Sequence, residues 1–156
     1  MALKQYKPYT KTTRSTVLID RSGLWKGKPY KSLTAPNKSV KGRNNLGRIT
    51  SRNHGGGHKQ KYRLIDFYRK KFDVVGSIER IEYDPNRSCH IMLVKFDDGE
   101  KAYYLAPQKI KVGDKIQNGP NSEIKVGNTL PLKDIPVGID IHNVEIQPGG
   151  GGKIAR

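Results

Sequence analysis

VVGSIERIEYDPNRSCHIMLVKFDDGEKAYYLAP, residues 74–107, decides the fold of this chain. Three runs in it are rich in β-branched and large apolar residues: 74–84, 88–96 and 101–107. DPNR (84–87) separates the first two runs and favours a turn, because Asp starts it and Pro presets the next φ. DDGE (97–100) separates the second and third and is typical of an Asp-Gly hairpin. The stretch therefore predicts three short strands joined by tight turns.

The residues that follow extend the same pattern. Further short strands are expected at 111–120, 124–132 and 135–152, each interrupted by Gly or Pro. Short strands separated by regular turn signals are typical of a small β-barrel. A single helical turn near 107–110 is the only helix expected. Because successive side chains of a strand point to opposite faces, at most one of Tyr103 and Tyr104 is expected in the core.

Charge divides the chain into two parts. The 156 residues include 30 Lys or Arg and 14 Asp or Glu, for a formal net charge of +16. Residues 1–63 hold sixteen of the cations and one acid, Asp20, whereas residues 64–156 hold fourteen cations and thirteen acids. A segment as polar as the first is not expected to build its own core. We therefore expect residues 1–63 to form an extended arm that orders on its partner, and the remainder to fold.

The last part of that arm, GRNNLGRITSRNHGGGHKQKYR (42–63), places many cations on a glycine-rich backbone. Its charges repel one another and its glycines lose entropy on ordering, so we expect a dense anion to bind there. A nucleotide phosphate, a membrane surface and a nucleic-acid backbone are the candidates. The chain has no apolar run of about 18 residues that would span a membrane, and no glycine run has the GxxxxGK[ST] spacing of a P-loop. The net charge and the pI of about 10.0 favour nucleic acid.

Arginines and asparagines of this stretch are the first candidate contacts. Arg43, Arg48 and Arg52 recur every few residues without acidic partners, and a guanidinium pairs with phosphate through a planar fork of donors. Asn44 and Asn45 are suited to 2′-hydroxyls or base edges. A solvated surface is the alternative interpretation. Trp25 and Tyr30, also in the arm, are candidates for stacking on bases.

The HGGGHK motif (54–59) supplies a second group of candidates. Its glycines are expected to bring backbone N–H groups against phosphate, and the flanking side chains add charge. The candidate residues are His54, Gly55, Gly56, Gly57, His58, Lys59, Lys61 and Arg63. A solvated loop is the alternative. Metal binding by the two histidines is disfavoured, because three glycines make a helix improbable and no Cys or third ligand is near.

The sequence contains no recognisable catalytic constellation. Ser, His and Asp are present without nucleophile-elbow spacing, and the acids between 79 and 84 alternate with arginines as charge balance. A single cysteine, Cys89, excludes an internal disulfide and a multi-cysteine metal site. We predict no enzymatic activity, no cofactor and no small-molecule substrate. Structural Mg²⁺ would reach the protein only through RNA.

Six sequence blocks, in the same order, resemble the bacterial-type large-subunit ribosomal protein two family. The blocks are GRNNLGRIT (42–50), HGGGHK (54–59), YRLIDF (62–67), ERIEYDPNRS (79–88), LAPQKIKVGD (105–114) and GNTLPLKDIPVGIDIHNVEIQPGGGGKIAR (127–156). The resemblance implies a structural constituent of the large ribosomal subunit that binds ribosomal RNA and assists assembly near the peptidyl-transferase region. It also implies an oligonucleotide-binding (OB) type barrel at 64–122 and the first part of an SH3-like barrel at 123–156, preceded by the basic arm.

The resemblance also implies individual RNA contacts. It places RNA-binding arginines at Arg87 and Arg156, and it places the glycine run 148–152 against RNA with Lys153 directly after it. A turn alone accounts for Asp84, Pro85 and Asn86, but not for Arg87. For the glycine run the alternative is a flexible linker.

Members of this family continue beyond the segment that corresponds to residue 156, and the arm that approaches the peptidyl-transferase region lies in that continuation. The chain is then either a fragment or one half of a split subunit. We expect the split subunit, with a separate chain carrying the C-terminal half and other ribosomal proteins as further partners. A split favours the mitochondrial matrix, with a bacterial cytoplasm or a plastid as alternatives; no membrane partner is expected. The competing hypothesis is an extra-ribosomal single-strand RNA-binding barrel or RNA chaperone, which the length of the arm disfavours.

Overall fold

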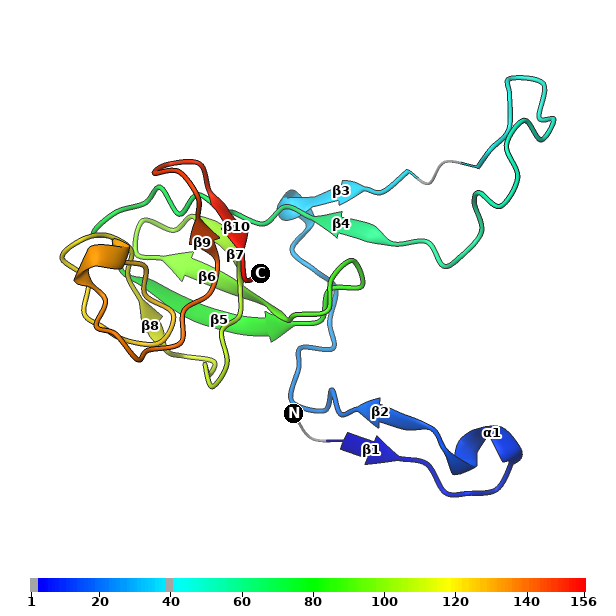
Figure 1. Ribbon diagram of the computed structural model, residues 1–156, viewed down its shortest axis with the longest axis horizontal. Helices are drawn as coiled ribbons and strands as arrows, with labels where there is room; N and C mark the ends of the chain where they lie inside the picture. The colour runs from blue at the N-terminus through cyan, green and yellow to red at the C-terminus, as the bar shows by residue number, and fades with distance from the viewer. Residues whose placement is uncertain (1–2, 39–40) are drawn as a thin grey trace.

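The computed structural model describes residues 3–38 and 41–156 and consists mainly of short strands joined by turns (Figure 1). The strands are β1 (Leu3–Gln5), β2 (Val17–Ile19), β3 (Thr34–Pro36), β4 (Lys61–Arg63), β5 (Gly76–Glu82), β6 (Ile91–Phe96), β7 (Lys101–Leu105), β8 (Lys115–Ile116), β9 (Val144–Glu145) and β10 (Gly152–Ile154). The helical elements among the described residues are α1 (Lys11–Arg14) and the 3-10 turns η1 (Lys31–Leu33) and η2 (Leu132–Asp134). The predicted all-β class is confirmed.

The centre of the fold is a four-stranded antiparallel sheet in the order β7-β6-β5-β8. Its first three strands lie within the runs 74–84, 88–96 and 101–107, as the sequence predicted. The Asp-Gly turn closes as expected, with Gly99 N donating to Phe96 O at 2.9 Å. Pairing of β5 with β6 carries a β-bulge, because Ile78 pairs with Val94 and Arg80 with Leu93, which leaves Glu79 as the extra residue. Such bulges bend a strand, and the sheet curls into the half-barrel expected of an OB-type fold (Figure 1).

Both faces of this sheet are buried. One face packs a cluster built from Ile78, Met92, Val94, Tyr104 and Ile116, with Phe96 at the sheet end. The other face packs Ile91, Leu93, Tyr103 and Leu105. Tyr103 and Tyr104 are both completely buried, so the prediction that at most one of them is core is wrong.

The second face is covered by residues of the predicted arm and by residues that directly follow it. Tyr30, Leu33, Ile65 and Phe67 pack against it. The Tyr103 hydroxyl accepts a hydrogen bond from Tyr30 N at 2.8 Å. Two residues of the predicted arm, Tyr30 and Leu33, thus pack on the barrel, because the sheet already supplies the opposing apolar surface. The boundary at residue 63 itself stays a prediction.

Two parts of the chain project from the half-barrel (Figure 1). Strands β1 and β2 pair as an N-terminal hairpin that carries α1 at its end. Strands β3 and β4 pair at the base of a second extension, which continues into a long loop, residues 41–60, called the arm loop below. Helix α1 was not predicted, although Thr10 and Thr13 form a capping box that marks its start.

Residues 123–156 form little regular structure. The strand expected at 124–132 is absent from these described residues, where only an isolated bridge joins Thr129 to Asn118. Arg69 fixes this segment to the barrel: it is 4% exposed, and its Nη1 donates to Gly127 O at 2.8 Å and to Thr129 Oγ1 at 2.9 Å. Strands β9 and β10 pair with each other. The SH3-like barrel expected here stays a prediction.

None of the helices that the structure describes is long and apolar enough to traverse a lipid bilayer.

Alkaline pH is expected to destabilise the fold through Tyr104. Burial raises the pKa of its hydroxyl to about 12 from the ordinary 10.0. As pH rises, the unfolded chain therefore loses this proton before the folded chain does. The stabilisation of the folded state by the protonated Tyr104 is complete below about pH 10 and is lost as pH rises from about 10 to 12. In urea unfolding, the wild type should lose about 2–3 kcal/mol more than Tyr104→Phe across that range. Parallel pH profiles of the two proteins would contradict this assignment.

Candidate nucleic-acid interface

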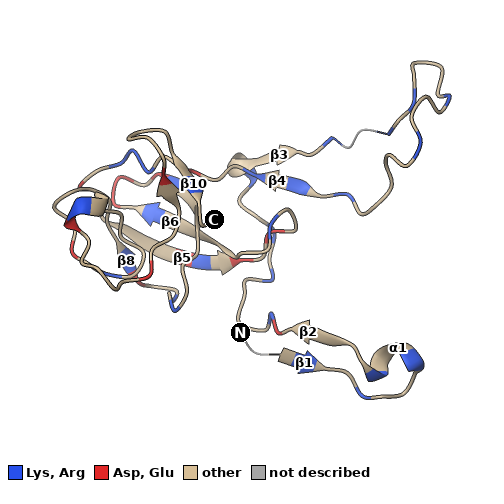
Figure 2. Cartoon of the chain, viewed as in Figure 1, with Lys and Arg blue, Asp and Glu red and all other residues tan. Residues whose placement is uncertain are grey.

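Lysine and arginine occur on both the extensions and the barrel, whereas acidic residues lie almost entirely on the barrel (Figure 2). In the arm loop, all lysine and arginine side chains are exposed: Lys41, Arg43, Arg48, Arg52 and Lys59. The N-terminal hairpin also exposes its cations, Lys4, Lys7, Lys11 and Arg14. No salt bridge involves any of these residues within 3–38 and 41–156. Their charges therefore face solvent without a protein counter-ion.

The outer part of the arm loop is a turn that internal hydrogen bonds hold in place. Gly42 O accepts hydrogen bonds from Thr50 N at 2.8 Å and Ser51 N at 3.1 Å. The Asn44 side chain accepts from Leu46 N at 3.1 Å and Arg48 N at 2.9 Å. Arg43 and Ile49 form an antiparallel bridge across the turn. Asn44, predicted as an RNA contact, thus uses its carbonyl oxygen to hold the backbone, while Asn45 is exposed.

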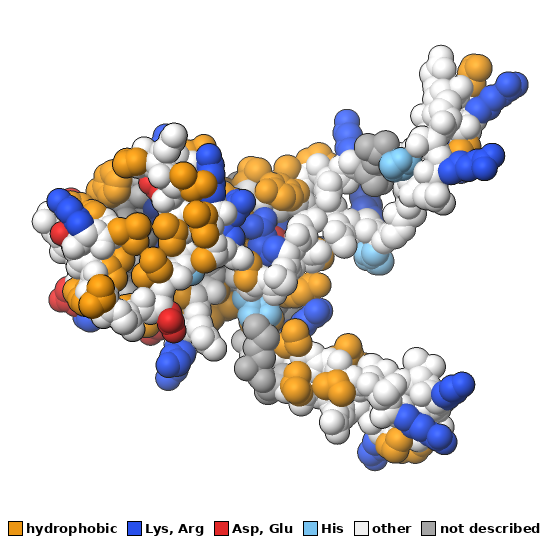
Figure 3. Space-filling view, viewed as in Figure 1, with side chains coloured by type: hydrophobic (Ala, Val, Ile, Leu, Met, Phe, Trp, Pro, Cys, Tyr) orange, Lys and Arg blue, Asp and Glu red, His pale blue; other side chains and the backbone are white. Residues whose placement is uncertain are grey.

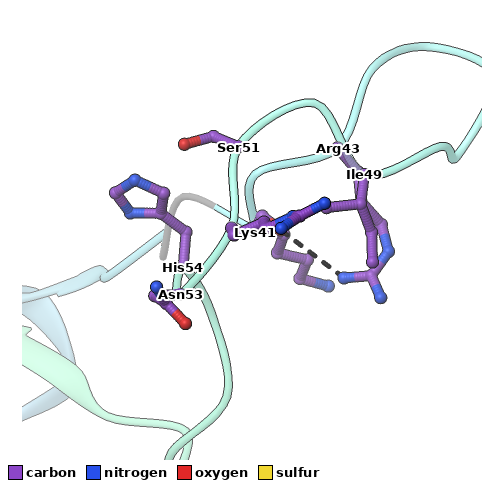
Figure 4. Close-up of a pocket in the computed structure, with 7 residues that line it drawn as sticks. Lys41, Arg43, Ile49, Ser51, Asn53 and His54 are labelled. Atoms are coloured by element: carbon purple, nitrogen blue, oxygen red, sulfur yellow. Dashed lines mark hydrogen bonds between the residues drawn. The ribbon is translucent and has the colours of Figure 1, made fainter.

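An open pocket of about 520 Å³ lies on this turn. Three of its lining residues are cationic, Lys41, Arg43 and Arg52, and no acidic residue lines it among the described residues. The side chains of Lys41 and Arg43 lie together, and the His54 ring lies on the other side of the loop (Figure 4). Converging cations without an acid can hold a phosphate group. Two of the predicted contacts, Arg43 and Arg52, thus line one pocket with Lys41, which was not among the predicted contacts. His54 also lines the pocket, with its ring on the other side of the loop (Figure 4).

The glycines of HGGGHK lie in an unusual backbone conformation. Gly55, Gly56 and Gly57 have φ of 91°, 79° and 75°. Three successive positive φ values are readily adopted only by glycine. No atom comes within 4 Å of a Cβ built on Gly56 or Gly57, so the backbone there is open to a close approach. His58 is exposed, and its Nδ1 lies 3.1 Å from Lys59 O.

At the base of the arm loop, two arginines that were predicted to contact RNA already pair with an acidic residue of the protein. Arg87 Nε donates to Asp84 Oδ2 at 2.6 Å, and Arg63 Nη1 lies 3.9 Å from Asp84 Oδ1. The Asp84 side chain is completely buried, and those of Arg63 and Arg87 are 11% and 16% exposed. Asn86 Nδ2 donates to Lys61 O at 2.8 Å, which ties the DPNR turn to β4. The turn therefore anchors the extension to the barrel, and an RNA contact by Arg87 stays a prediction.

The C-terminal candidates lie apart from the arm loop in the fold. Lys153 is exposed on β10. Arg156 is exposed, with its guanidinium carbon 4.8 Å from the centroid of the Phe67 ring. Within the glycine run, Gly152 N donates to Phe67 O at 3.1 Å, so this part of the run packs on the barrel. The expected RNA contacts of this region stay predictions.

Several cations stack on exposed aromatic rings, which the sequence pattern did not reveal. Arg21 lies 3.7 Å from the centroid of the Tyr83 ring, and Arg80 lies 4.9 Å from that of Trp25. Trp25 is 50% exposed but is also held by the barrel, since its N donates to Ile81 O at 2.8 Å. Rings that already accept a flat cation present π-faces of the kind on which bases stack.

No group of three or more His, Cys, Asp or Glu side chains in the described ranges is arranged to hold a metal ion. His54 and His58, the pair considered from the sequence, both lie in the exposed arm loop.

Gly42→Ala tests whether the shape of the arm turn matters. Gly42 has φ +62°, and an added Cβ would lie 2.2 Å from Ser51 O. We expect this variant to bind RNA at least about fivefold more weakly than Gly47→Ala, because both carry left-handed strain but only the first adds a backbone clash. Gly47 has φ +77° with no atom within 4 Å of an added Cβ, which makes it the matched control. Equal affinities by filter binding, with equal unfolding midpoints, would show that the turn geometry is unimportant.

Comparison with known proteins identifies similar sequences along the whole chain. The family model described as Ribosomal Proteins L2, RNA binding N-terminal domain, matches residues 30–118. The large ribosomal subunit protein uL2 of Pelagibacter ubique is 73% identical over 157 residues, covering 100% of this chain and 56% of that protein. The uL2 proteins of Granulibacter bethesdensis and Mesorhizobium japonicum are 59% and 57% identical, with the same coverage. The chain thus spans 56% of the length of each of these curated relatives.

Proposed function

Because this chain belongs to the family of ribosomal proteins L2, within which it matches the RNA-binding N-terminal domain, we propose that it binds large-subunit ribosomal RNA as a structural component of that subunit. The family is one of ribosomal proteins, so the proposed role is structural rather than catalytic. The proposal concerns this chain, which corresponds to 56% of each compared relative.

The observation that carries the proposal is the arm loop. Its cations are all exposed and form no salt bridge in the part of the chain that the structure describes. Its turn is nevertheless ordered by backbone and Asn44 hydrogen bonds. A preorganised loop of unpaired cations suits an anion of fixed shape, such as folded RNA, because less ordering entropy is lost on binding.

We infer that the extensions and the barrel have different roles in RNA binding. The extensions neutralise phosphates, on the order of ten to fifteen by the number of exposed cations. The barrel fixes the position of the arm loop at its base. There Asp84 pairs with Arg63, and Asn86 donates to Lys61 O. Tyr103 accepts a hydrogen bond from Tyr30 N nearby. Phosphate contacts fix position, and base contacts would supply sequence preference.

The compared relatives come from bacteria, and they support a bacterial ribosome for this protein. The mitochondrial matrix expected from the sequence receives no support from these relatives and stays a prediction. The expected contacts with other ribosomal proteins and with a chain carrying the remaining part of the family sequence also stay predictions.

The proposed function is tested by selective binding. We expect the full chain to bind transcribed large-subunit ribosomal RNA and to remain with it during sedimentation at 0.2–0.5 M salt, with small-subunit ribosomal RNA as a poor competitor. These salt concentrations suppress purely non-specific binding, whose dissociation constant is on the order of 1 to 100 µM at physiological salt. Equal competition by the two RNAs would overturn the ribosomal assignment and support a free single-strand RNA-binding barrel or RNA chaperone.

A further inference from the structure

A second open pocket, of about 820 Å³, lies at the base of the arm and is called the basal groove below. It is formed by the chain around η1, the residues leading into β4, and the turn after β5. The residues used in the argument below are Lys28, Lys31, Lys59, Lys61, Tyr83 and Pro85. Its volume lies within the range of about 300–1,000 Å³ typical of sites for small organic ligands.

The lining of the basal groove combines two chemistries. Lys28, Lys31, Lys59 and Lys61 are all exposed, and no Asp or Glu contributes to the lining among the residues that the structure describes. Tyr83 and Pro85 supply a ring and an apolar surface beside them. A cationic rim beside a flat apolar surface matches a nucleotide, which joins a phosphate to a planar base.

Tyr83 is well placed to serve as the stacking surface. Its side chain follows β5 and precedes the buried Asp84, which fixes the backbone at that point through its bonds to Asn86 N and Arg87 Nε. The residue is 37% exposed, so part of it reaches solvent. The Arg21 guanidinium lies over one face of the ring, 3.7 Å from its centroid, so a base would stack on the opposite face. The ring is therefore both accessible and held by a rigid part of the fold.

We propose that the basal groove holds one unstacked base of a single-stranded RNA segment, with Tyr83 against the base and the surrounding lysines against its phosphates. This inference rests on the proposed function, since it specifies how RNA is engaged at one place. It predicts that the protein recognises an extruded nucleotide in addition to the phosphate backbone.

A single strand fits this groove better than a duplex does. In a duplex both faces of each base are covered by neighbours, so a Tyr ring cannot reach a base without extruding it. The arm loop, by contrast, requires only phosphates. An acidic peptide would satisfy the lysines but would leave the Tyr83 ring without a planar partner.

The test compares Tyr83→Ala with Tyr83→Phe in the full chain. The probes are a fluorescent eight-nucleotide oligouridylate and a blunt A-form RNA duplex of equal charge, measured by anisotropy at fixed salt. We expect Tyr83→Ala to weaken oligouridylate binding by about 5- to 150-fold, with duplex affinity and salt slope unchanged, because one stacked base is lost. Tyr83→Phe should stay close to wild type, because it keeps the ring. A 2-aminopurine placed in the oligonucleotide should be quenched by the wild type and by Tyr83→Phe only.

Each remaining outcome overturns a definite part of the account. If the wild type binds neither probe nor transcribed large-subunit ribosomal RNA, the proposed function itself fails. If it binds the ribosomal RNA but not the oligouridylate, only the base site in the basal groove fails. If it binds both probes and Tyr83→Ala changes neither, or changes both equally, the basal groove is not a base site while RNA binding stands. Tighter binding of a polyglutamate peptide than of oligouridylate, lost in Lys59→Ala with Lys61→Ala, would assign the groove to an acidic protein segment instead.

Discussion

Replacing Arg43, Arg48 and Arg52 together with alanine is expected to weaken binding of large-subunit ribosomal RNA by about 100-fold, since each lost charge-assisted contact costs roughly 1 kcal/mol. The three side chains are exposed on the ordered turn of the arm loop. Their removal should leave the fold intact, because they pack against nothing in the core. The slope of log affinity against log salt should fall in magnitude by about 2 to 3. Filter binding over a salt series measures both quantities.

The matched control removes the same charge elsewhere. Lys111, Lys115 and Lys133 are exposed; Lys115 belongs to β8 and Lys133 to η2. Strand β8 lies at the end of the barrel away from the arm loop (Figure 1). The triple alanine variant of these lysines should keep RNA affinity within a few-fold of wild type. Equal losses in the two triple variants would mean that net charge alone drives binding and that the arm loop has no special role.

Asp84→Ala is expected to cost about 3 kcal/mol of unfolding free energy, because it removes a fully buried carboxylate and leaves two largely buried guanidinium groups without their partner. Those groups belong to Arg63 on β4 and Arg87 after the turn. The variant should also loosen the base of the arm, since Asn86 loses the oxygen that accepts from its backbone and side chain. Urea unfolding followed by circular dichroism gives the free energy, and hydrogen exchange at β3 and β4 reports the loosening.

Two further variants serve as controls for the Asp84→Ala prediction. Asp84→Asn keeps the shape and one acceptor oxygen but removes the charge, so it should fall between wild type and alanine. Asp134→Ala removes an exposed carboxylate from η2 and should change stability by less than about 0.5 kcal/mol. If Asp84→Ala were as mild as Asp134→Ala, the network would contribute nothing to holding the arm on the barrel.

The exposed apolar side chains of residues 123–156 show what local pattern can and cannot predict (Figure 3). Strands β5, β6 and β7 were found because β-branched runs and turn residues act locally. Val137, Ile139 and Ile141 are β-branched and alternate like the residues of a strand. They are nevertheless exposed and lie outside the described strands. Regular structure there depends on pairing partners that a local reading does not supply.

The candidate site shows the same contrast. The arm loop was identified from charge and glycine content, which depend on composition alone. Asn44, Arg63 and Arg87 each proved to be engaged by the protein. Asn44 and Arg87 bond to neighbours within four residues, whereas Arg63 depends on Asp84, which the fold brings next to it. Burial of both Tyr103 and Tyr104 followed from Tyr30 and Leu33 crossing the second face of the sheet, a contact over some seventy residues that alternation cannot reveal.

The salt dependence of RNA binding tests most directly whether the extensions neutralise a folded polyanion. For ten to fifteen phosphates, log affinity of the wild-type chain for large-subunit ribosomal RNA should fall with log salt with a slope of about 7 to 13 in magnitude. A slope of only one or two would contradict the account, because it would leave most of the exposed cations without a phosphate.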